Sequence, residues 1–340
     1  MYLSIVEPFI QQHVGPNYRI EKVIDGANNQ CFKILSDTGN YFLKCFCEHT
    51  QNSHKKLVNE FQFTQLLHKQ GIKDVATPIA YCEQNLVALY SLLPGQPIRR
   101  SSPTLVEDAF DFINRINTAT YDLAIPKASD ATEEVADFLK IVFNRLQRFS
   151  QIDTIEDVEV KTLLAQIEQR AKQISEQTLQ WTLALECQHL SPSDFGFHNA
   201  LIDADGKLAF FDFEYAGLDS YWKLVCDFFS QPKVPVDTNT FSSVSKLNVS
   251  PSFDNHKAEF LACFELTQLK WCLIMLNAFD PQIAQRRAFA RHEYCFDSKS
   301  SNNQLSKTTM QLNKCKQYMQ AIPEKLNVLD DILSAQHWKI

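Results

Sequence analysis

A change of hydrophobic pattern near Gly95 limits what this chain can fold into. Before it, runs rich in β-branched and aromatic residues predict strands over 18–24, 30–35, 40–47, 75–82 and 86–92. One helical stretch, 54–70, interrupts these strands. After it, apolar residues at helical spacing predict helices over 104–119, 131–150, 157–179, 220–230, 258–279, 281–296, 305–320 and 323–335. The pattern therefore predicts an α+β protein with a small antiparallel sheet in 1–95 and a larger, mainly helical part in 96–340.

Composition excludes several classes of protein. The 340 residues hold 33 Lys and Arg against 40 Asp and Glu, and this acidic balance disfavours a nucleic-acid binder. No apolar run is long enough to span a membrane, and no secretory signal is visible at the N-terminus. The ten cysteines include no C-x-x-C pair, so we expect buried, reduced thiols in a cytoplasmic protein. Nothing in the sequence indicates an oligomeric state.

The net charge is distributed unevenly along the chain. Residues 1–95 carry 8 basic and 8 acidic side chains, so the whole net charge of −7 falls in 96–340. An acidic surface raises the local concentration of cationic ligands. The helical part therefore favours a cationic small molecule over an anionic one, unless these carboxylates only solvate outer helix faces.

One segment of the helical part carries three polar residues between apolar runs. Asp194 is followed five residues later by Asn199, and a predicted hairpin then delivers Asp212. This order fits phosphoryl transfer, in which one aspartate orients a hydroxyl while an asparagine and a second aspartate hold Mg²⁺. Oxygen ligands, few of them from the protein, are what Mg²⁺ prefers.

The same pattern resembles protein kinases and, more closely, the aminoglycoside phosphotransferase family, which includes choline and related small-molecule kinases. The resemblance implies a two-lobed protein-kinase-like fold, with a nucleotide-binding lobe and hinge in 1–95 and the catalytic loop and acceptor site in 96–340. It implies Asp194 as the catalytic residue, Asn199 and Asp212 as Mg²⁺ ligands, and ATP, or alternatively GTP, as the phosphoryl donor. Asp227 resembles the family's structural aspartate, which braces the catalytic loop.

The N-terminal residues fit the nucleotide half of such a fold. Lys44 lies on the third predicted strand, where the fold places its phosphate-binding lysine, and Glu60 follows in the next helix as its expected partner. The stretch 89–95 resembles the hinge, so we expect the backbone of Ser91 and Leu93 to meet the adenine edge. In the phosphate-covering loop, Asn28 and Asn29 are the candidate contacts. These six residues make up the predicted nucleotide site.

Several positions depart from the family pattern. Pro192 stands where a histidine commonly precedes the catalytic aspartate by two, and the loop 25–30 has one glycine. Glu214 occupies the glycine position of an Asp-Phe-Gly motif. The short run from Asp212 to Asp227 leaves no room for a long activation segment, which disfavours protein substrates.

Other polar residues are open to two interpretations. His198 is expected to stabilise the loop by a hydrogen bond. The Lys270–Cys272 stretch is expected in the core, with Trp271 alternatively forming a substrate wall. The basic residues Arg286, Arg287 and Arg291, with His292, are expected on a solvated helix face or, alternatively, at an anionic substrate. The polar stretches 231–256 and 298–304 predict a long loop or lid and a connector.

The leading hypothesis is an ATP-dependent phosphotransferase that acts on a hydroxyl of a small polar metabolite. The acceptor could be aminoglycoside-like, choline-like or sugar-like, including a nucleotide-linked sugar. The alternative is a nucleotide-binding regulatory protein with little or no turnover. The missing histidine and the loop with one glycine permit this alternative. Against it stands the retention of all five expected polar residues, which are Lys44, Glu60, Asp194, Asn199 and Asp212.

Overall fold

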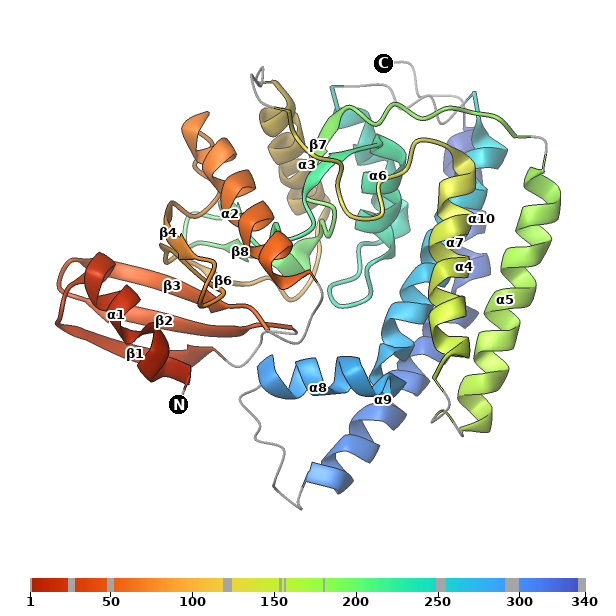
Figure 1. Cartoon of the computed structure of the whole chain (residues 1–340). Coiled ribbons are helices and arrows are strands. Elements are labelled where there is room, and N and C mark those ends of the chain that lie inside the picture. The colour runs from red at the N-terminus through yellow and green to blue at the C-terminus, as the bar shows by residue number, and fades with distance from the viewer. Residues whose placement is uncertain are drawn as a thin grey trace. The chain divides into compact units, whose positions relative to one another are not determined.

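The computed structural model describes residues 2–23, 28–47, 52–118, 124–152, 155, 157–179, 181–248, 255–290 and 300–335. The chain divides into two compact units that are discontinuous in sequence. Unit 1 comprises Met1–Pro97, Asn199–Ala216 and Gln282–Ser298, and unit 2 comprises Ile98–His198, Gly217–Pro281 and Lys299–Ile340. Antiparallel strands and long helices are both present, which confirms the predicted α+β class (Figure 1).

Unit 1 is built around an antiparallel sheet of five strands in the order β1-β2-β3-β5-β4. Its strands are β1 (Tyr18–Val23), β2 (Gln30–Ser36), β3 (Gly39–Cys45), β4 (Pro78–Cys82) and β5 (Val87–Ser91). Each strand lies within a few residues of its predicted range. The pattern of β-branched and aromatic residues was therefore sufficient to locate the sheet.

Two helices cover opposite faces of this sheet, because successive strand residues point to opposite sides. Leu43, Val87 and Leu89 pack against α1 (Tyr2–Val14). Ala88 and Tyr90 pack on the other side, against α2 (Ser53–Lys69). The sequence interpretation missed α1, although its buried residues Val6, Ile10 and Val14 are spaced four apart, as on one helix face.

A second, three-stranded sheet in unit 1 has the order β6-β8-β9. Its strands are β6 (Gln96–Pro97), β8 (Ala200–Ile202) and β9 (Leu208–Phe210). Gly95, at φ +112°, precedes β6, and a Cβ on it would lie only 2.6 Å from the Ile202 carbonyl oxygen. Phe210 N–H also donates to the Asp74 carbonyl oxygen at 2.8 Å. The β8–β9 hairpin is thus fixed within the unit that holds the N-terminal sheet.

Unit 2 is mainly helical, with a short two-stranded sheet. Its α-helices are α3 (Pro103–Thr118), α4 (Val135–Ser150), α5 (Val158–Thr178), α6 (Tyr221–Ser230), α7 (Lys257–Leu276), α9 (Ser300–Gln320) and α10 (Ile322–Ser334), and its strands are β7 (His189–Ser191) and β10 (Gly217–Asp219). Helix α8 (Pro281–Ala290) spans the boundary between the units. Within the described residues, predicted and observed helices agree except at their ends, and the part 291–296 of the predicted helix 281–296 lies outside these residues.

Helix α7 forms the centre of unit 2 and contacts α4, α5, α6, α9 and α10 (Figure 1). Its sequence is apolar on all sides, which is typical of a buried helix. The polar side chains that it buries are paired: Glu265 with Arg170 at 2.5 Å, and Gln268 with the Ser230 hydroxyl at 2.7 Å. Such pairing is required because an unpaired polar group is costly to bury.

Two expectations about loops are wrong. The stretch 231–248 is anchored rather than an open loop or lid, since it contains the 3₁₀ helix η2 (Thr238–Lys246) with Phe241 and Val244 buried. Asn114 of α3 also donates to the Lys246 carbonyl oxygen at 2.7 Å. The predicted connector 298–304 already belongs to α9 from Ser300 onward, whereas 298 and 299 lie outside the described residues. Burial of scattered apolar residues outweighed the polar composition of 231–248.

No helix within the described residues is long and apolar enough to cross a membrane.

Candidate active site

Lys44 is the centre of a buried polar cluster in unit 1. Because Leu43 and Cys45 face α1, the alternation of β3 directs Lys44 toward the α2 side of the sheet. Its Nζ lies 2.5 Å from Glu60 Oε2 on α2 and 2.5 Å from Asp212 Oδ1 after β9. Lysine and glutamate side chains are 6% exposed each, so both are removed from water. Three predicted site residues therefore meet at one ammonium group.

The β8–β9 hairpin places Asn199 and Asp212 near each other. Ala200 pairs with Phe210, and the Phe211 N–H donates to the Asn199 carbonyl oxygen at 3.1 Å. Asn199, directly before β8, and Asp212, shortly after β9, thus lie at the same end of the hairpin. Asp212 has φ +68°, in the left-handed region that non-glycine residues seldom adopt. Strained backbone of this kind is concentrated at functional sites.

Glu214 is a further member of this cluster, and the sequence interpretation missed it. Its Oε1 lies 2.9 Å from Lys56 Nζ, and its Oε2 lies 3.6 Å from Lys44 Nζ and accepts a hydrogen bond from Asn29 Nδ2 at 2.9 Å. The sequence signal for this role is an acidic residue at the position where the motif has glycine. We call Lys44, Lys56, Glu60, Asp212 and Glu214 the Lys44 cluster.

The Lys44 cluster holds three carboxylates but two lysines, and its pKa values reflect this excess. Burial acts to lower the pKa of Lys44, but the three carboxylates outweigh it and hold that pKa well above its usual value. Burial raises the pKa of Glu60 to about 8, although Lys44 opposes it. Burial also acts upward on Glu214, but Lys44 and Lys56 hold its pKa at about 2. Glu60 is therefore largely protonated at neutral pH, and the cluster carries a surplus negative charge only when Glu60 ionises.

The carboxylate oxygens of this cluster could hold a cation. Oxygen atoms of Glu60, Asp212 and Glu214 lie within 4.8 Å of one another. Among the three, Asp212 is the accessible one, with 34% of its side chain exposed against 6% for Glu60 and 2% for Glu214. An incoming ion would therefore meet Asp212 first. The Asn199 amide supplies a further oxygen on the same hairpin.

The expected phosphate loop and hinge lie in the same unit. Asn28 is half-buried and Asn29 is tied to Glu214, whereas residues 25–27 lie outside the described part of the chain. At the hinge, the Ser91 N–H donates to the Thr77 carbonyl oxygen at 2.8 Å, and the Thr77 N–H donates to Ser91 Oγ at 2.8 Å. Leu92 N–H donates to the Asn40 carbonyl oxygen at 2.9 Å. These hydrogen bonds fix the backbone that leads into Leu93.

Asp194 lies in unit 2, on a loop held by aromatic side chains. Phe195 and Phe197 on either side of Gly196 are buried against Phe228, with ring centroids 5.1 and 5.3 Å away. Asp194 keeps 31% of its side chain exposed, and its Oδ1 lies 3.2 Å from His198 Nε2. The loop thus points its phenylalanines inward and its aspartate outward.

The remaining candidates are the Lys270–Cys272 stretch, Asp227 and the arginines of α8. The Trp271 ring meets the His198 ring edge-on at 6.4 Å, and Lys270 and Cys272 are buried as expected. Asp227 forms ion pairs with Lys270 and, at 3.4 Å, with Lys223. On α8, Arg286 and Arg287 are half-buried rather than fully solvated, whereas residues 291 and 292 lie outside the described residues.

Comparison with known families places the chain. The model of the phosphotransferase enzyme family matches residues 19–223, which is more than half of the chain. The chain belongs to this family. The matched range contains Lys44, Glu60, Asp194, Asn199 and Asp212, and it ends before Asp227. A search of curated proteins found no match.

Solved structures show the same fold at low sequence identity. A spectinomycin phosphotransferase in complex with ADP and spectinomycin is 12% identical, with a TM-score of 0.57 over 93% of this chain and 98% of that one. Choline kinase from Cryptosporidium parvum is 13% identical, with a TM-score of 0.51 over 97% of this chain and 99% of that one. Ethanolamine kinase from Plasmodium vivax is 12% identical, with a TM-score of 0.53 over 91% of this chain and 88% of that one. The fold is therefore protein-kinase-like.

Proposed function

We propose that this protein is a kinase that transfers the γ-phosphoryl group of ATP to a hydroxyl of a small molecule. The observation that carries the proposal is the meeting of Lys44 with Glu60 and Asp212, at 2.5 Å each. In kinases, this lysine and its glutamate partner hold the nucleotide phosphates, and the aspartate holds the metal. Family membership supports a phosphotransferase of this kind.

The residues present fit a magnesium ion. Asn199 and Asp212 offer amide and carboxylate oxygens from one hairpin, and the carboxylate excess of the Lys44 cluster would be balanced by an added cation. We propose these two residues as the ligands, with Mg²⁺ supplying charge neutralisation at the β- and γ-phosphates when bound. Lys44 would then exchange part of its contact with Asp212 for the α- and β-phosphates.

The hinge backbone would bind the adenine. The N–H groups of Ser91 and Leu92 are engaged with Thr77 and Asn40. Ser91 would therefore offer its carbonyl oxygen and Leu93 its N–H, an acceptor and a donor that match the adenine edge. GTP in place of ATP would reverse this pattern at the base. Asn28 and Asn29 would lie over the phosphates, with Asn29 held by Glu214.

Asp194 would orient the acceptor hydroxyl and accept its proton. A carboxylate with part of its surface exposed and one oxygen beside His198 Nε2 suits this role, because the histidine fixes its direction. Since the protein forms no covalent bond to the phosphoryl group, most of the rate would come from positioning and electrostatics. Asp194 therefore takes the catalytic role in this proposal.

For the acceptor we propose an amine-bearing alcohol. The seven excess negative charges all lie in 96–340, which would attract a cation. The similar structures named above include a choline kinase, an ethanolamine kinase and an enzyme bound to spectinomycin. A protein substrate is disfavoured by the short run from Asp212 to Asp227.

Two variants test the assigned roles. Asp194→Asn should lower kcat by about 10²–10⁴-fold while leaving the Kd for Mg-ATP unchanged. Asp212→Ala should instead weaken Mg-ATP binding itself. Calorimetry with ATP and GTP, with and without Mg²⁺, measures the second effect. Absence of any Mg²⁺-dependent nucleotide binding by the wild-type protein would refute the proposed function.

The acceptor is tested by a screen of ATP consumption with choline, ethanolamine, spectinomycin and neutral sugars. We expect the highest kcat/KM with an amine-bearing alcohol, and a decrease in kcat/KM at high salt because ions screen the attraction. A neutral sugar preferred without salt dependence would refute the cationic acceptor and leave the kinase proposal standing.

A further inference from the structure

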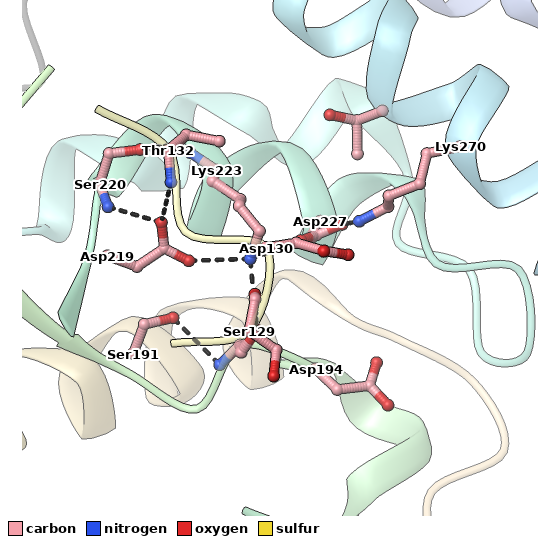
Figure 2. Close-up of polar contacts among 12 residues, drawn as sticks. Ser129, Asp130, Thr132, Ser191, Asp194, Asp219, Ser220, Lys223, Asp227 and Lys270 are labelled. Atoms are coloured by element: carbon pink, nitrogen blue, oxygen red, sulfur yellow. Dashed lines mark hydrogen bonds and ion pairs between the residues drawn. The ribbon is translucent and has the colours of Figure 1, made fainter. Parts of the chain in front are cut away.

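A second buried ionic cluster lies in unit 2, and it consists of Asp219, Lys223, Asp227 and Lys270 (Figure 2). Lys223 and Asp227 are four residues apart on α6 and share one helix face, and Asp219 precedes the helix at the end of β10. Their side chains are between 0% and 9% exposed. We call these four residues the Lys223 cluster.

The Lys223 ammonium group contacts two carboxylates and one hydroxyl. Its Nζ lies 2.8 Å from Asp219 Oδ2 and 3.4 Å from Asp227 Oδ2. It also donates a hydrogen bond to Ser193 Oγ at 3.3 Å. Since the two carboxylates already balance the charge together with Lys270, the contact with Ser193 is not needed for neutrality. It links the cluster to the residue directly before Asp194.

The carboxylates of the cluster are themselves fixed. Asp219 Oδ1 accepts hydrogen bonds from the backbone N–H groups of Thr132 at 3.1 Å and Ser220 at 2.8 Å (Figure 2). Asp227 forms an ion pair with Lys270 of the central helix α7. These contacts therefore fix the position from which the Lys223 ammonium group donates to Ser193.

Ser193 is the residue that needs this support. Its φ is +66°, and the Asp194 N–H donates to the Pro192 carbonyl oxygen at 2.9 Å, so Ser193 is the central residue of a three-residue turn. Turns of this γ type with positive φ are rare and strained. Such a conformation persists only when its surroundings hold it.

The Ser193 side chain is held from two sides. Its Oγ accepts from Lys223 Nζ and donates to the Ser129 carbonyl oxygen at 3.3 Å. The Ser193 N–H in turn donates to Ser191 Oγ at 3.1 Å. Pro192, which has no N–H and no polar side chain, cannot contribute such a contact.

We propose that Lys223 is a positioning residue that holds the strained turn at Ser193 and thereby aims the Asp194 carboxylate. This inference rests on the proposed function for the role of Asp194, but the support of the turn can be measured separately. Lys223 does not meet the reacting atoms. It acts through the Ser193 hydroxyl.

The first test removes the hydroxyl and keeps every ion pair. In Ser193→Ala, hydrogen–deuterium exchange of the 190–199 peptide should rise about tenfold or more, because local opening becomes easier. With the best acceptor from the screen, kcat should decrease by about 10- to 100-fold at an unchanged Kd for Mg-ATP. Ser230→Ala is the matched control, since it removes another buried serine hydroxyl of unit 2, the partner of Gln268. It should change neither readout.

Two further variants distinguish the hydrogen bond of the Ser193 hydroxyl from the backbone conformation of Ser193 and from the charge of Lys223. Ser193→Gly permits the positive φ but lacks the hydroxyl, so it should be as impaired as Ser193→Ala; wild-type behaviour of the glycine variant would overturn the proposal. Lys223→Met should reproduce both effects, and if it does not fold, the serine variants still decide. Unchanged exchange in Ser193→Ala, or an equal rise in Ser230→Ala, would also overturn it. If the wild type transfers no phosphoryl group, the proposed function fails, whereas the exchange result still decides whether the turn is held this way.

Discussion

The two buried ionic clusters of this protein differ in charge balance and in access to water. The Lys44 cluster has three carboxylates and two lysines, and 34% of the Asp212 side chain is exposed. The Lys223 cluster pairs two aspartates with two lysines, and none of these side chains is more than 9% exposed. One cluster is therefore open and has one more carboxyl group than lysines, whereas the other is closed and has equal numbers of both.

This difference indicates different uses of the same residue types. A buried carboxyl group that can release its proton, beside an exposed carboxylate, leaves a place for a cation, which is what a nucleotide-bound metal requires. A neutral, dry cluster has no such place, and removing one partner leaves an uncompensated buried charge. We therefore propose ligand binding for the first cluster and support of the backbone for the second. Substitutions in each cluster test this difference through their effect on the free energy of unfolding.

The largest effect is expected for Asp227→Asn in the Lys223 cluster. The change leaves Lys223 and Lys270 buried with one carboxylate between them, so the free energy of unfolding should fall by about 3–5 kcal/mol. Burial already holds the pKa of Lys270 below its usual value, so this lysine can lose its proton and limit the cost. Urea unfolding followed by circular dichroism measures the change. A loss below about 1 kcal/mol would show that this cluster does not hold the fold.

The next effect is a dependence on pH in the Lys44 cluster. Burial raises the pKa of Glu60 from 4.5 to about 8, so between these values the native state keeps a proton that the unfolded state has lost. Stability should therefore fall as the pH rises through this window, by up to about 1.4 kcal/mol per pH unit. Glu60→Gln cannot ionise and should remove this part of the slope. Unfolding curves of both proteins at pH 5, 6, 7 and 8 measure the difference, and equal slopes would contradict the carboxylate excess.

A smaller effect on stability is expected for Asp212→Asn. Its side chain is partly exposed, and Glu60 and Glu214 still face Lys44 in the variant, so the free energy of unfolding should change by less than about 1 kcal/mol. Mg²⁺-dependent ATP binding should be lost in the same variant. Thermal melts with and without Mg-ATP measure both, because a ligand that binds the native state raises the Tm. A large loss of stability would make the two clusters alike and break the comparison.

The smallest effect on the free energy of unfolding is expected at an exposed ion pair, which serves as the reference for the buried pairs. Lys257 Nζ lies 2.6 Å from Asp330 Oδ1, with side chains 38% and 48% exposed. Lys257→Met should change the free energy of unfolding by no more than about 0.5 kcal/mol. The same urea experiment measures it. A change as large as that of Asp227→Asn would mean that burial is not the reason for the difference between clusters.

Much of the fold could be predicted from local patterns. Alternating strands before Gly95 and helical spacing after it located nearly every element, because the period of apolar residues reports which side each residue buries. Helix α1 also had such a spacing in Val6, Ile10 and Val14, and we overlooked it. The stretch 231–248 could not be predicted, since its polar composition outweighs the few apolar residues that the packing buries.

The candidate site was predicted in part. The order of Asp194, Asn199 and Asp212 follows from a short motif, and the Lys44–Glu60 pairing follows from a strand and the helix after it. Glu214 was missed because the motif has glycine at that position. Its importance depends on Lys56 and Asn29, which are far away in the sequence and meet it only in the fold.

The sequence by itself determined the element types, the two-part pattern and the polar residues able to serve phosphoryl transfer. These properties depend on neighbouring residues and their spacing, which the chain carries directly. Only the tertiary structure decided which charges are neutralised: that Lys44 meets three carboxylates, and that Lys223 reaches Ser193 as well as two aspartates. The reason is physical, because the energy of a charge depends on its burial and on its nearest partners, and both are set by packing between distant segments.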